Sequence, residues 1–206
     1  MSMQSTNAAK ETLIVGLGNP GREYEASRHN LGWACVDELA RRLEVDVSRK
    51  RWKSLVGSAA RDGGRVWLIK PQTMMNLSGQ AVAAAVRDVG VDLESIWIVH
   101  DELDLPLCRL RIRVGGSGAG NNGVRSVIGS LGSPDFVRFR IGVGKPPSPA
   151  AGVRYVLSGF SRVEQPRVPA VIKGTADALE LALTGGLKKA MDLYNQAGAL
   201  GCEELA

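Results

Sequence analysis

Residues 12–21 read TLIVGLGNPG, an apolar run that ends in a glycine-containing loop. A short apolar run closed by a glycine turn is typical of a buried strand. After the loop, residues 30–43 (NLGWACVDELARRL) carry apolar side chains at helical spacing, with Asn30 as a candidate N-cap. A strand that is followed by a glycine loop and a helix predicts an α/β fold, because such a helix packs back onto the sheet.

The rest of the chain continues this alternation of strands and helices. The pattern predicts a hairpin of 54–60 and 65–70, helices over 77–89 and 121–131, strands over 95–100, 107–114 and 136–143, a loop at 145–150, and mostly helix over 161–196. We expect one domain over 11–197, built on a twisted, mixed and mostly parallel sheet with helices on both faces. Residues 1–10 are predicted to be a disordered lead and 198–206 a flexible tail.

The positive charge of the chain is concentrated in one segment. The net charge of the whole protein is +5, whereas residues 107–145 hold seven basic residues and one acid, a net charge of +6. Arg109, Arg111 and Arg113 alternate with apolar residues, so a strand would present all three on one face. A solvated edge strand could show the same pattern. Three arginines without an interleaved acid favour phosphate contacts, which points to a nucleic-acid partner.

Cysteine content and hydropathy indicate the compartment. The three cysteines, Cys35, Cys108 and Cys202, are widely spaced and form no CxxC pair, which disfavours a disulfide framework or a zinc site. No apolar run approaches the roughly 20 residues that a membrane-spanning helix needs. We therefore expect a cytoplasmic protein without a membrane association.

The loop GLGNPG, residues 16–21, matches the dinucleotide-binding pattern GxGxxG. In a dinucleotide fold the helix begins at the glycines, so that its N-terminus meets the pyrophosphate. Here the helical period begins only near residue 30, and no acidic residue falls on a clear following strand. The pattern therefore favours a tight turn over a nicotinamide or flavin site.

The two histidines differ in their surroundings. His100 closes the apolar strand SIWIVH and is expected to be structural, whereas His29 lies in a polar loop at the start of a helix. An imidazole there can serve as a general base. Asp101, the first carboxylate of HDELDLP (100–106), could orient it. Because the chain has only two histidines, the carboxylates of HDELDLP are only weak evidence for a metal site.

The sequence offers no obvious covalent nucleophile. It has no serine in a GxSxG context, and Cys35 falls on the apolar side of a predicted helix. Water is therefore the expected nucleophile of any hydrolysis. Asparagines recur where loops begin, and although each is common in turns, together they could bind an amide-rich substrate or an oxyanion: Asn19, Asn30, Asn76, Asn121 and Asn122.

Five segments together resemble the signature blocks of bacterial-type peptidyl-tRNA hydrolases. They are GLGNPGREYEASRHNLG, MMNLSGQAV, HDELDLP, GGSGAGNNGVRS and FRIGVG, in family order, and the resemblance covers nearly all of residues 12–196. It implies a monomeric translation enzyme without cofactor or metal that hydrolyses the ester between a peptide and the 3′ end of tRNA.

The resemblance also implies roles for individual residues. His29 corresponds to the family's base, Asp101 to the aspartate that orients it, and Asn19 to a further catalytic-site asparagine. Other positions correspond to substrate-binding residues, with the last two holding the tRNA phosphate: Tyr24, Met75, Asn76, Asn122, Arg113 and Arg140.

One block departs from the family. It usually ends His-Asn-Gly, but here it ends Asn121-Asn122-Gly123, and Gly118 and Ala119 occupy the region of its other common histidine. We expect this change to affect substrate affinity rather than chemistry, with Asn121 peripheral to catalysis. The alternative function is a protein of the same fold that binds RNA without catalysis.

Overall fold

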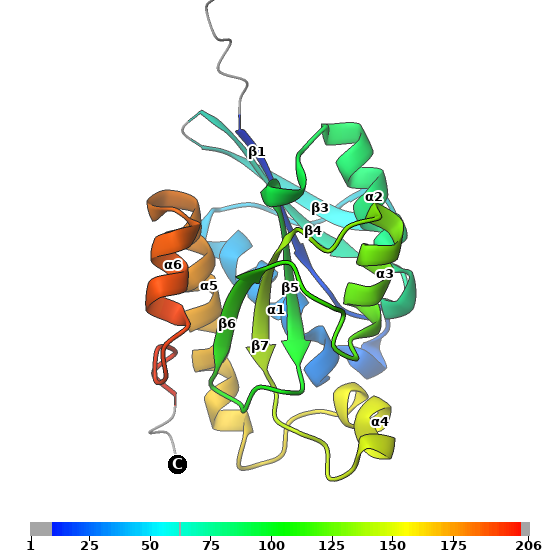
Figure 1. The fold of residues 1–206 in the computed structure, drawn as a ribbon, viewed down its shortest axis with the longest axis vertical. Coiled ribbons are helices and arrows are strands. Elements are labelled where there is room, and N and C mark those ends of the chain that lie inside the picture. The colour runs from blue at the N-terminus through cyan, green and yellow to red at the C-terminus, as the bar shows by residue number, and fades with distance from the viewer. Residues whose placement is uncertain (1–9, 62, 203–206) are drawn as a thin grey trace, which may run out of the picture.

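The computed structural model describes residues 10–61 and 63–202, which form a seven-stranded sheet between two layers of helices (Figure 1). The strand order is β2-β3-β4-β1-β5-β7-β6. The strands are β1 (Lys10–Gly16), β2 (Arg49–Arg51), β3 (Ser54–Arg61), β4 (Gly64–Pro71), β5 (Ile96–Glu102), β6 (Leu110–Val114) and β7 (Val137–Gly142). The helices are α1 (Leu31–Arg42), α2 (Ser78–Val89), α3 (Asn122–Leu131), α4 (Gly152–Leu157), α5 (Val168–Gly185) and α6 (Leu187–Tyr194).

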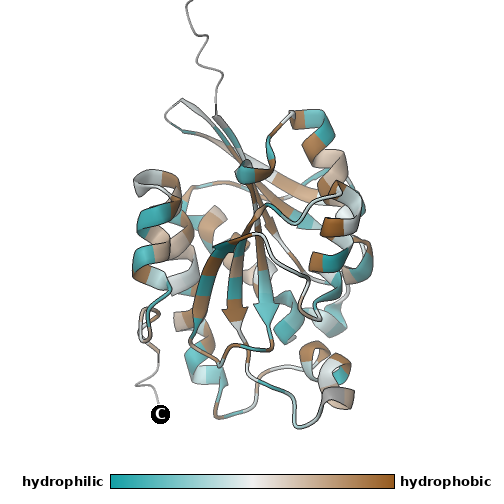
Figure 2. Ribbon diagram, in the orientation of Figure 1, coloured by the Kyte–Doolittle hydropathy of each residue, from teal (hydrophilic) through white to brown (hydrophobic). Residues whose placement is uncertain are grey.

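Two apolar cores lie on opposite faces of the sheet. In β1, Ile14 joins the core under α1, α5 and α6, while Leu13 and Val15 join the core under α2 and α3. This alternation follows from the two-residue period of a strand. The strands are apolar along most of their length, whereas the helices carry polar residues as well (Figure 2). The predicted α/β architecture with helices on both faces is therefore confirmed.

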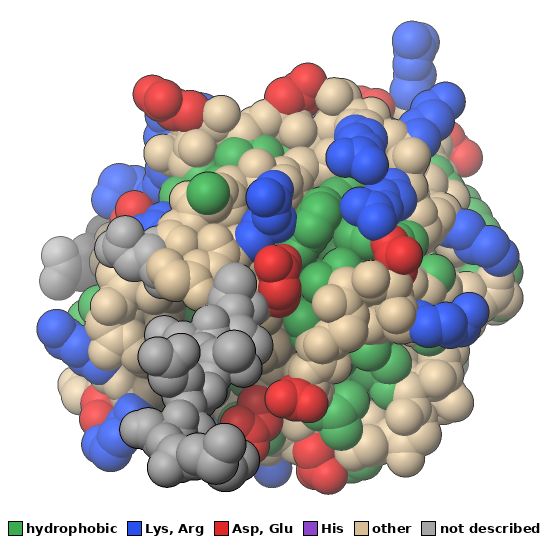
Figure 3. Space-filling model, turned by 90° about the horizontal axis from the view of Figure 1, so that it is seen from above, with side chains coloured by type: hydrophobic (Ala, Val, Ile, Leu, Met, Phe, Trp, Pro, Cys, Tyr) green, Lys and Arg blue, Asp and Glu red, His purple; other side chains and the backbone are tan. Residues whose placement is uncertain are grey.

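The four central strands β4, β1, β5 and β7 are parallel, and antiparallel strands flank them on both sides. Their carboxyl ends therefore share one edge of the sheet, near α4 (Figure 1). Loops at this edge of an α/β sheet commonly build binding sites. At the other end of the molecule, basic, acidic and apolar side chains are intermixed (Figure 3).

Two glycines bring α1 close to the sheet. A Cβ at Gly32 would lie 2.7 Å from the Leu17 carbonyl oxygen and closer still to that of Val99. A Cβ at Gly16 would lie 2.9 Å from Val36 Cγ2. Neither position has room for a larger residue, so the first turn of α1 is held against the ends of β1 and β5.

The sequence-based prediction was wrong at three places. Residues 145–150 were expected to be a loop, but 149–151 form a 3-10 turn that leads into the unpredicted helix α4. Strand β6 begins at Leu110 instead of residue 107, and β2 had no counterpart in the prediction. Short elements such as α4 and β2 carry too few residues to display a period.

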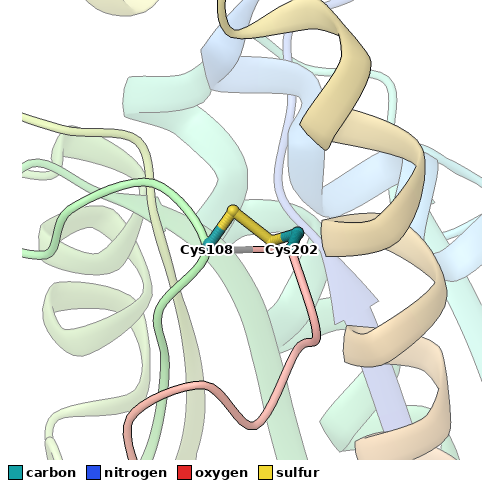
Figure 4. The surroundings of a disulfide bond; sticks show 2 residues. All are labelled: Cys108 and Cys202. Carbon is teal, nitrogen blue, oxygen red and sulfur yellow. A yellow bond between two sulfur atoms is a disulfide. The ribbon is translucent and has the colours of Figure 1, made fainter. Parts of the chain in front are cut away.

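The expectation that the cysteines form no disulfide was also wrong. Cys108, between β5 and β6, is bonded to Cys202 near the C-terminus, and their Cα atoms are 5.7 Å apart (Figure 4). The two residues are 94 positions apart, so only the tertiary structure brings them together. Cys202 and Leu200 are buried although they lie in the predicted tail at 198–206. Of the predicted lead at 1–10, Lys10 instead begins strand β1, and residues 1–9 lie outside the described residues. None of the described helices is long and apolar enough to span a membrane.

We expect the disulfide to stabilise the fold, because it closes a loop of 94 residues. Cys202→Ser should lower the melting temperature, since loss of a native disulfide typically costs about 2–5 kcal/mol. A reducing agent should lower the melting temperature of the parent to that of the variant and leave the variant unchanged. Equal melting temperatures for the oxidised parent and the variant would contradict this expectation.

Candidate functional site

A cavity of about 430 Å³ opens at the carboxyl edge of the parallel strands. Its wall is formed by loops that follow β1, β4 and β5, by the start of α3 and by α4. The lining residues are Asn19, His29, Met74, Met75, Asn76, Asp101, Glu102, Leu103, Ala119, Gly120, Asn121, Asn122, Gly152, Val153, Val156 and Leu157.

A histidine–aspartate pair lies in this wall. His29 belongs to the 3-10 turn η2 (Arg28–Asn30) immediately before α1, and Asp101 belongs to β5. His29 Nδ1 is 2.8 Å from Asp101 Oδ1, and the side chains are only 9% and 2% exposed. An Nδ1–H that donates to the carboxylate leaves Nε2 to accept a proton, which is the geometry of an oriented general base.

His100 has a different environment. It is 1% exposed, and its Nδ1 lies 2.8 Å from the carbonyl oxygen of Asp101. Burial lowers the pKa of His100, because the charged imidazolium would lose its hydration. A neutral imidazole bound to the backbone agrees with the structural role expected for His100.

Asparagine side chains hold the loops around His29. The Asn30 side chain accepts from the Asn19 backbone N–H at 2.8 Å and donates to the Asn19 carbonyl at 2.9 Å. Asn30 is the N-cap residue of α1, as predicted, but its side chain makes no capping hydrogen bond because it binds Asn19 instead. Asn19 Oδ1 accepts from the Met75 backbone N–H at 2.7 Å. This bond fixes the amide orientation and leaves the Asn19 side-chain NH₂ as a donor.

Asn121 contacts the histidine–aspartate pair, contrary to our expectation of a peripheral position. Its Nδ2 donates to Asp101 Oδ1 at 3.0 Å, while its Oδ1 caps α3 by accepting from Gly123 N and Val124 N. Strand β6 runs antiparallel to β7, so the following loop starts at the opposite edge and must cross back to this site. The sequence placed Asn121 in a glycine loop, but it did not show that this loop crosses back to the catalytic edge of the sheet.

The other predicted substrate-binding residues fall into two groups. Met75, Asn76 and Asn122 line the cavity, whereas Tyr24, in the 3-10 turn η1 (Arg22–Tyr24), does not. Gly123 permits Met75 to pack here, because a Cβ at Gly123 would collide with the Met75 sulfur.

The arginines form a separate basic surface on β6 and β7. Arg111 lies opposite Arg140 and Arg113 lies opposite Arg138, so the four arginines share one face. Arg111 and Arg113 are exposed. Arg140 Nε donates to Glu102 Oε2 at 2.9 Å, and Glu102 lines the cavity, which links this surface to the site.

Arg138 lies beneath this surface. Its guanidinium donates to the carbonyl oxygens of Ser117, at 2.6 Å, and Gly115. Burial, with help from Arg140 and Arg113, lowers the pKa of Arg138 to about 10. Arg138 therefore organises the loop after β6, while Arg111 and Arg113 remain exposed to a ligand.

Sequence reasoning missed the wall formed by α4. Its position depends on Arg28, which is 4% exposed and donates to Ser158 Oγ at 3.0 Å and to Glu164 Oε2 at 2.7 Å. The guanidinium carbon also lies 4.1 Å from the centre of the Tyr155 ring. The residue before His29 thus ties α4 to the site. The sequence block RHN drew attention to His29, but nothing in it indicated a contact 130 residues away.

The remaining candidates for chemistry lie elsewhere. Cys35 belongs to α1 and its thiol is buried, which raises its pKa to about 12, so it is not a reactive nucleophile. Within the described parts of the chain, no group of three or more histidine, cysteine and acidic side chains is arranged to hold a metal ion.

Comparison with known proteins finds close relatives. A family model described as peptidyl-tRNA hydrolase matches residues 13–200. The peptidyl-tRNA hydrolase of Geotalea uraniireducens is 45% identical over 183 residues, which cover 89% of this chain and 95% of the relative. That of Chloroflexus aggregans is 45% identical over 184 residues, covering 89% of this chain and 98% of the relative.

Solved structures of peptidyl-tRNA hydrolases also resemble this chain. The crystal structure of peptidyl-tRNA hydrolase from Acinetobacter baumannii has a TM-score of 0.85 and 32% sequence identity to this chain. The match covers 96% of this chain and 98% of that protein.

Proposed function

Because the chain belongs to the peptidyl-tRNA hydrolase family, we propose that it hydrolyses peptidyl-tRNA with water activated by His29. It is an esterase, and the bond cleaved joins a peptide to the 3′ end of tRNA. Its relatives favour this activity over RNA binding without catalysis. The observation that carries the proposed mechanism is the 2.8 Å contact between His29 and Asp101 in the cavity wall.

In the proposed reaction, His29 Nε2 takes a proton from water as the oxygen attacks the ester carbonyl carbon. Asp101 stabilises the resulting imidazolium and keeps the ring oriented. The tetrahedral intermediate then expels the 3′ oxygen of tRNA, which receives the proton from His29. The side-chain NH₂ groups of Asn19, Asn76 and Asn122 are neutral donors for the peptide carbonyls and the oxyanion.

The basic surface on β6 and β7 is the proposed site for the tRNA phosphate. Arg113 and Arg140 lie diagonally across the two strands, and Arg140 is tied to Glu102 of the cavity wall. Guanidinium groups suit phosphate oxygens because their N–H donors match them in pairs. Tyr24 lies outside the cavity and is retained only as a more distant substrate contact. We further propose a monomer that needs no cofactor and acts in the cytoplasm. The proposed tRNA substrate supports this location, whereas the cysteines no longer do, because Cys108 and Cys202 are bonded.

His29→Ala should abolish hydrolysis while preserving the fold and tRNA binding, because water then has no base. General-base catalysis typically contributes about 10²–10⁴-fold in rate. In the parent, kcat/KM should fall at acid pH, since protonated imidazole cannot accept a proton. Turnover of purified peptidyl-tRNA, tRNA binding and circular dichroism would be measured on both proteins. A folded variant with near-parent turnover would eliminate this mechanism.

Asn121 should affect chemistry, because its amide donates to the aspartate that orients His29. Asn121→Ser keeps a good cap for α3 but is too short to retain the Asp101 contact. Since a hydrogen bond to a charged group contributes about 1.5–3 kcal/mol, kcat should fall roughly tenfold or more. The same bond stabilises the fold, so the melting temperature should also fall by several degrees, and kcat is compared well below both melting temperatures. A raised KM with unchanged kcat would instead restore the peripheral role first expected for Asn121.

Arg113→Ala and Arg140→Ala should each raise KM more than they lower kcat. Each lost phosphate contact should also flatten the dependence of log affinity on log salt by about one unit, because fewer counterions are released on binding. Lys189→Ala, an exposed cation on α6, provides the control. If both arginine variants kept the parent's KM and salt slope, these residues would not hold the phosphate.

A further inference from the structure

A second hollow, here called the basic subsite, lies beside the catalytic cavity. It has a volume of about 630 Å³ and is lined chiefly by Lys50, Arg51, Lys53, Gln72 and Thr73. Gln72 and Thr73 lead directly into Met74 and Met75, which line the catalytic cavity. The Gln72 backbone N–H donates to the Lys53 carbonyl at 2.8 Å, so the turn between β2 and β3 is fixed to the catalytic-site loop.

The cations of the basic subsite are only partly neutralised. Arg51 pairs with Asp88, which also accepts from Trp52 Nε1. Lys53 is exposed and donates to the neutral Gln80 side chain at 2.7 Å. Neither Lys50 nor Lys53 makes an ion pair with any residue in 10–61 or 63–202. Two ammonium groups are therefore available to an anionic ligand.

The backbone of this turn is unusual. Trp52 and Lys53 have φ angles of 50° and 54°, a left-handed conformation that two-residue hairpin turns usually build from asparagine and glycine. Contacts of Trp52 hold the turn: its ring packs edge-on against Trp67, and Arg51 stacks on it. Strained backbone of this kind is concentrated at functional sites. Here it holds a lysine next to the loop that lines the catalytic cavity.

The strand order indicates which part of the substrate meets the basic subsite. The proposed phosphate-binding arginines lie on β6 and β7, at one side of the sheet, and the basic subsite lies at β2 and β3, at the other. Between them lie Asp101, on β5, and His29, in the turn η2 of the connection that follows β1. If the RNA approaches over β6 and β7, the peptide on the other side of the ester extends towards β4 and β3.

We propose that the basic subsite binds an acidic side chain of the peptide, a few residues before the ester. This proposal rests on the function proposed above and deepens it, because it assigns a side-chain preference to the peptide. Thr73 and Met75 are two positions apart, so the two hollows are separated by at most about 7 Å of extended chain at this point. An exposed carboxylate–ammonium attraction is weak and sensitive to salt, so the preference should be modest.

The test uses N-acetylated pentapeptidyl-tRNAs that carry aspartate or asparagine at the third or fourth residue from the ester. For the parent at low salt, we expect kcat/KM to be about threefold higher for aspartate than for asparagine at one of these positions. High salt should abolish the difference. The double variant Lys50→Gln/Lys53→Gln should lose the preference, whereas Arg61→Gln, at the far end of β3, should keep it.

Other outcomes overturn the proposal in distinguishable ways. Equal kcat/KM for both peptides with the parent would exclude an acidic-peptide subsite, even if the double variant failed to fold. N-acetylaminoacyl-tRNA has no residue that could reach the basic subsite. If kcat/KM of the double variant fell by the same factor for this substrate and for both peptides, the lysines would contact RNA instead. Absence of any hydrolysis by the parent would remove the proposed function and the subsite together.

Discussion

The close approach of α1 to the sheet is the constraint on which the site depends. Gly32 lies against the backbone of Leu17 and Val99, and Gly16 lies against α1, so that neither position can carry a side chain. His29 comes three residues before Gly32, and Asp101 comes two residues after Val99. Bringing Gly32 to Val99 therefore also brings His29 to Asp101. A bulkier residue at Gly32 would push the helix outward and separate the base from its carboxylate.

Neutral amides hold the loops at this edge in place of charged groups. Asn30 binds both backbone polar groups of Asn19, and Asn19 binds the backbone of Met75. Asn121 joins the start of α3 to Asp101. Asn19 and Asn121 each use the side-chain oxygen to fix a loop, which determines the direction of the side-chain NH₂ group. A site prearranged in this way does not need to reorganise as charge develops during the reaction.

The catalytic cavity lies between two basic surfaces, and acidic side chains pair with only some of the basic residues of each. On β6 and β7, Arg140 is paired with Glu102, whereas Arg111 and Arg113 are exposed beside it. On β2 and β3, Asp88 neutralises Arg51, and the two lysines remain unpaired within the described chain. The wall opposite is α4, held by Arg28 through Ser158 and Glu164. A substrate lying along the edge of the sheet would meet charge at both ends and mostly neutral groups in the middle.

The sequence by itself determined the strands and helices with a clear period, the chemical candidates His29 and Asp101, and the arginine stripe of β6. These features are local, because hydrophobic period and residue type are set by neighbouring positions. The direction of β6, the partner of Asn121, the Cys108–Cys202 bond and the anchoring of α4 by Arg28 were decided only by the tertiary structure. Each depends on residues that are distant in the chain and meet only after the strands have paired, so no local pattern contains them.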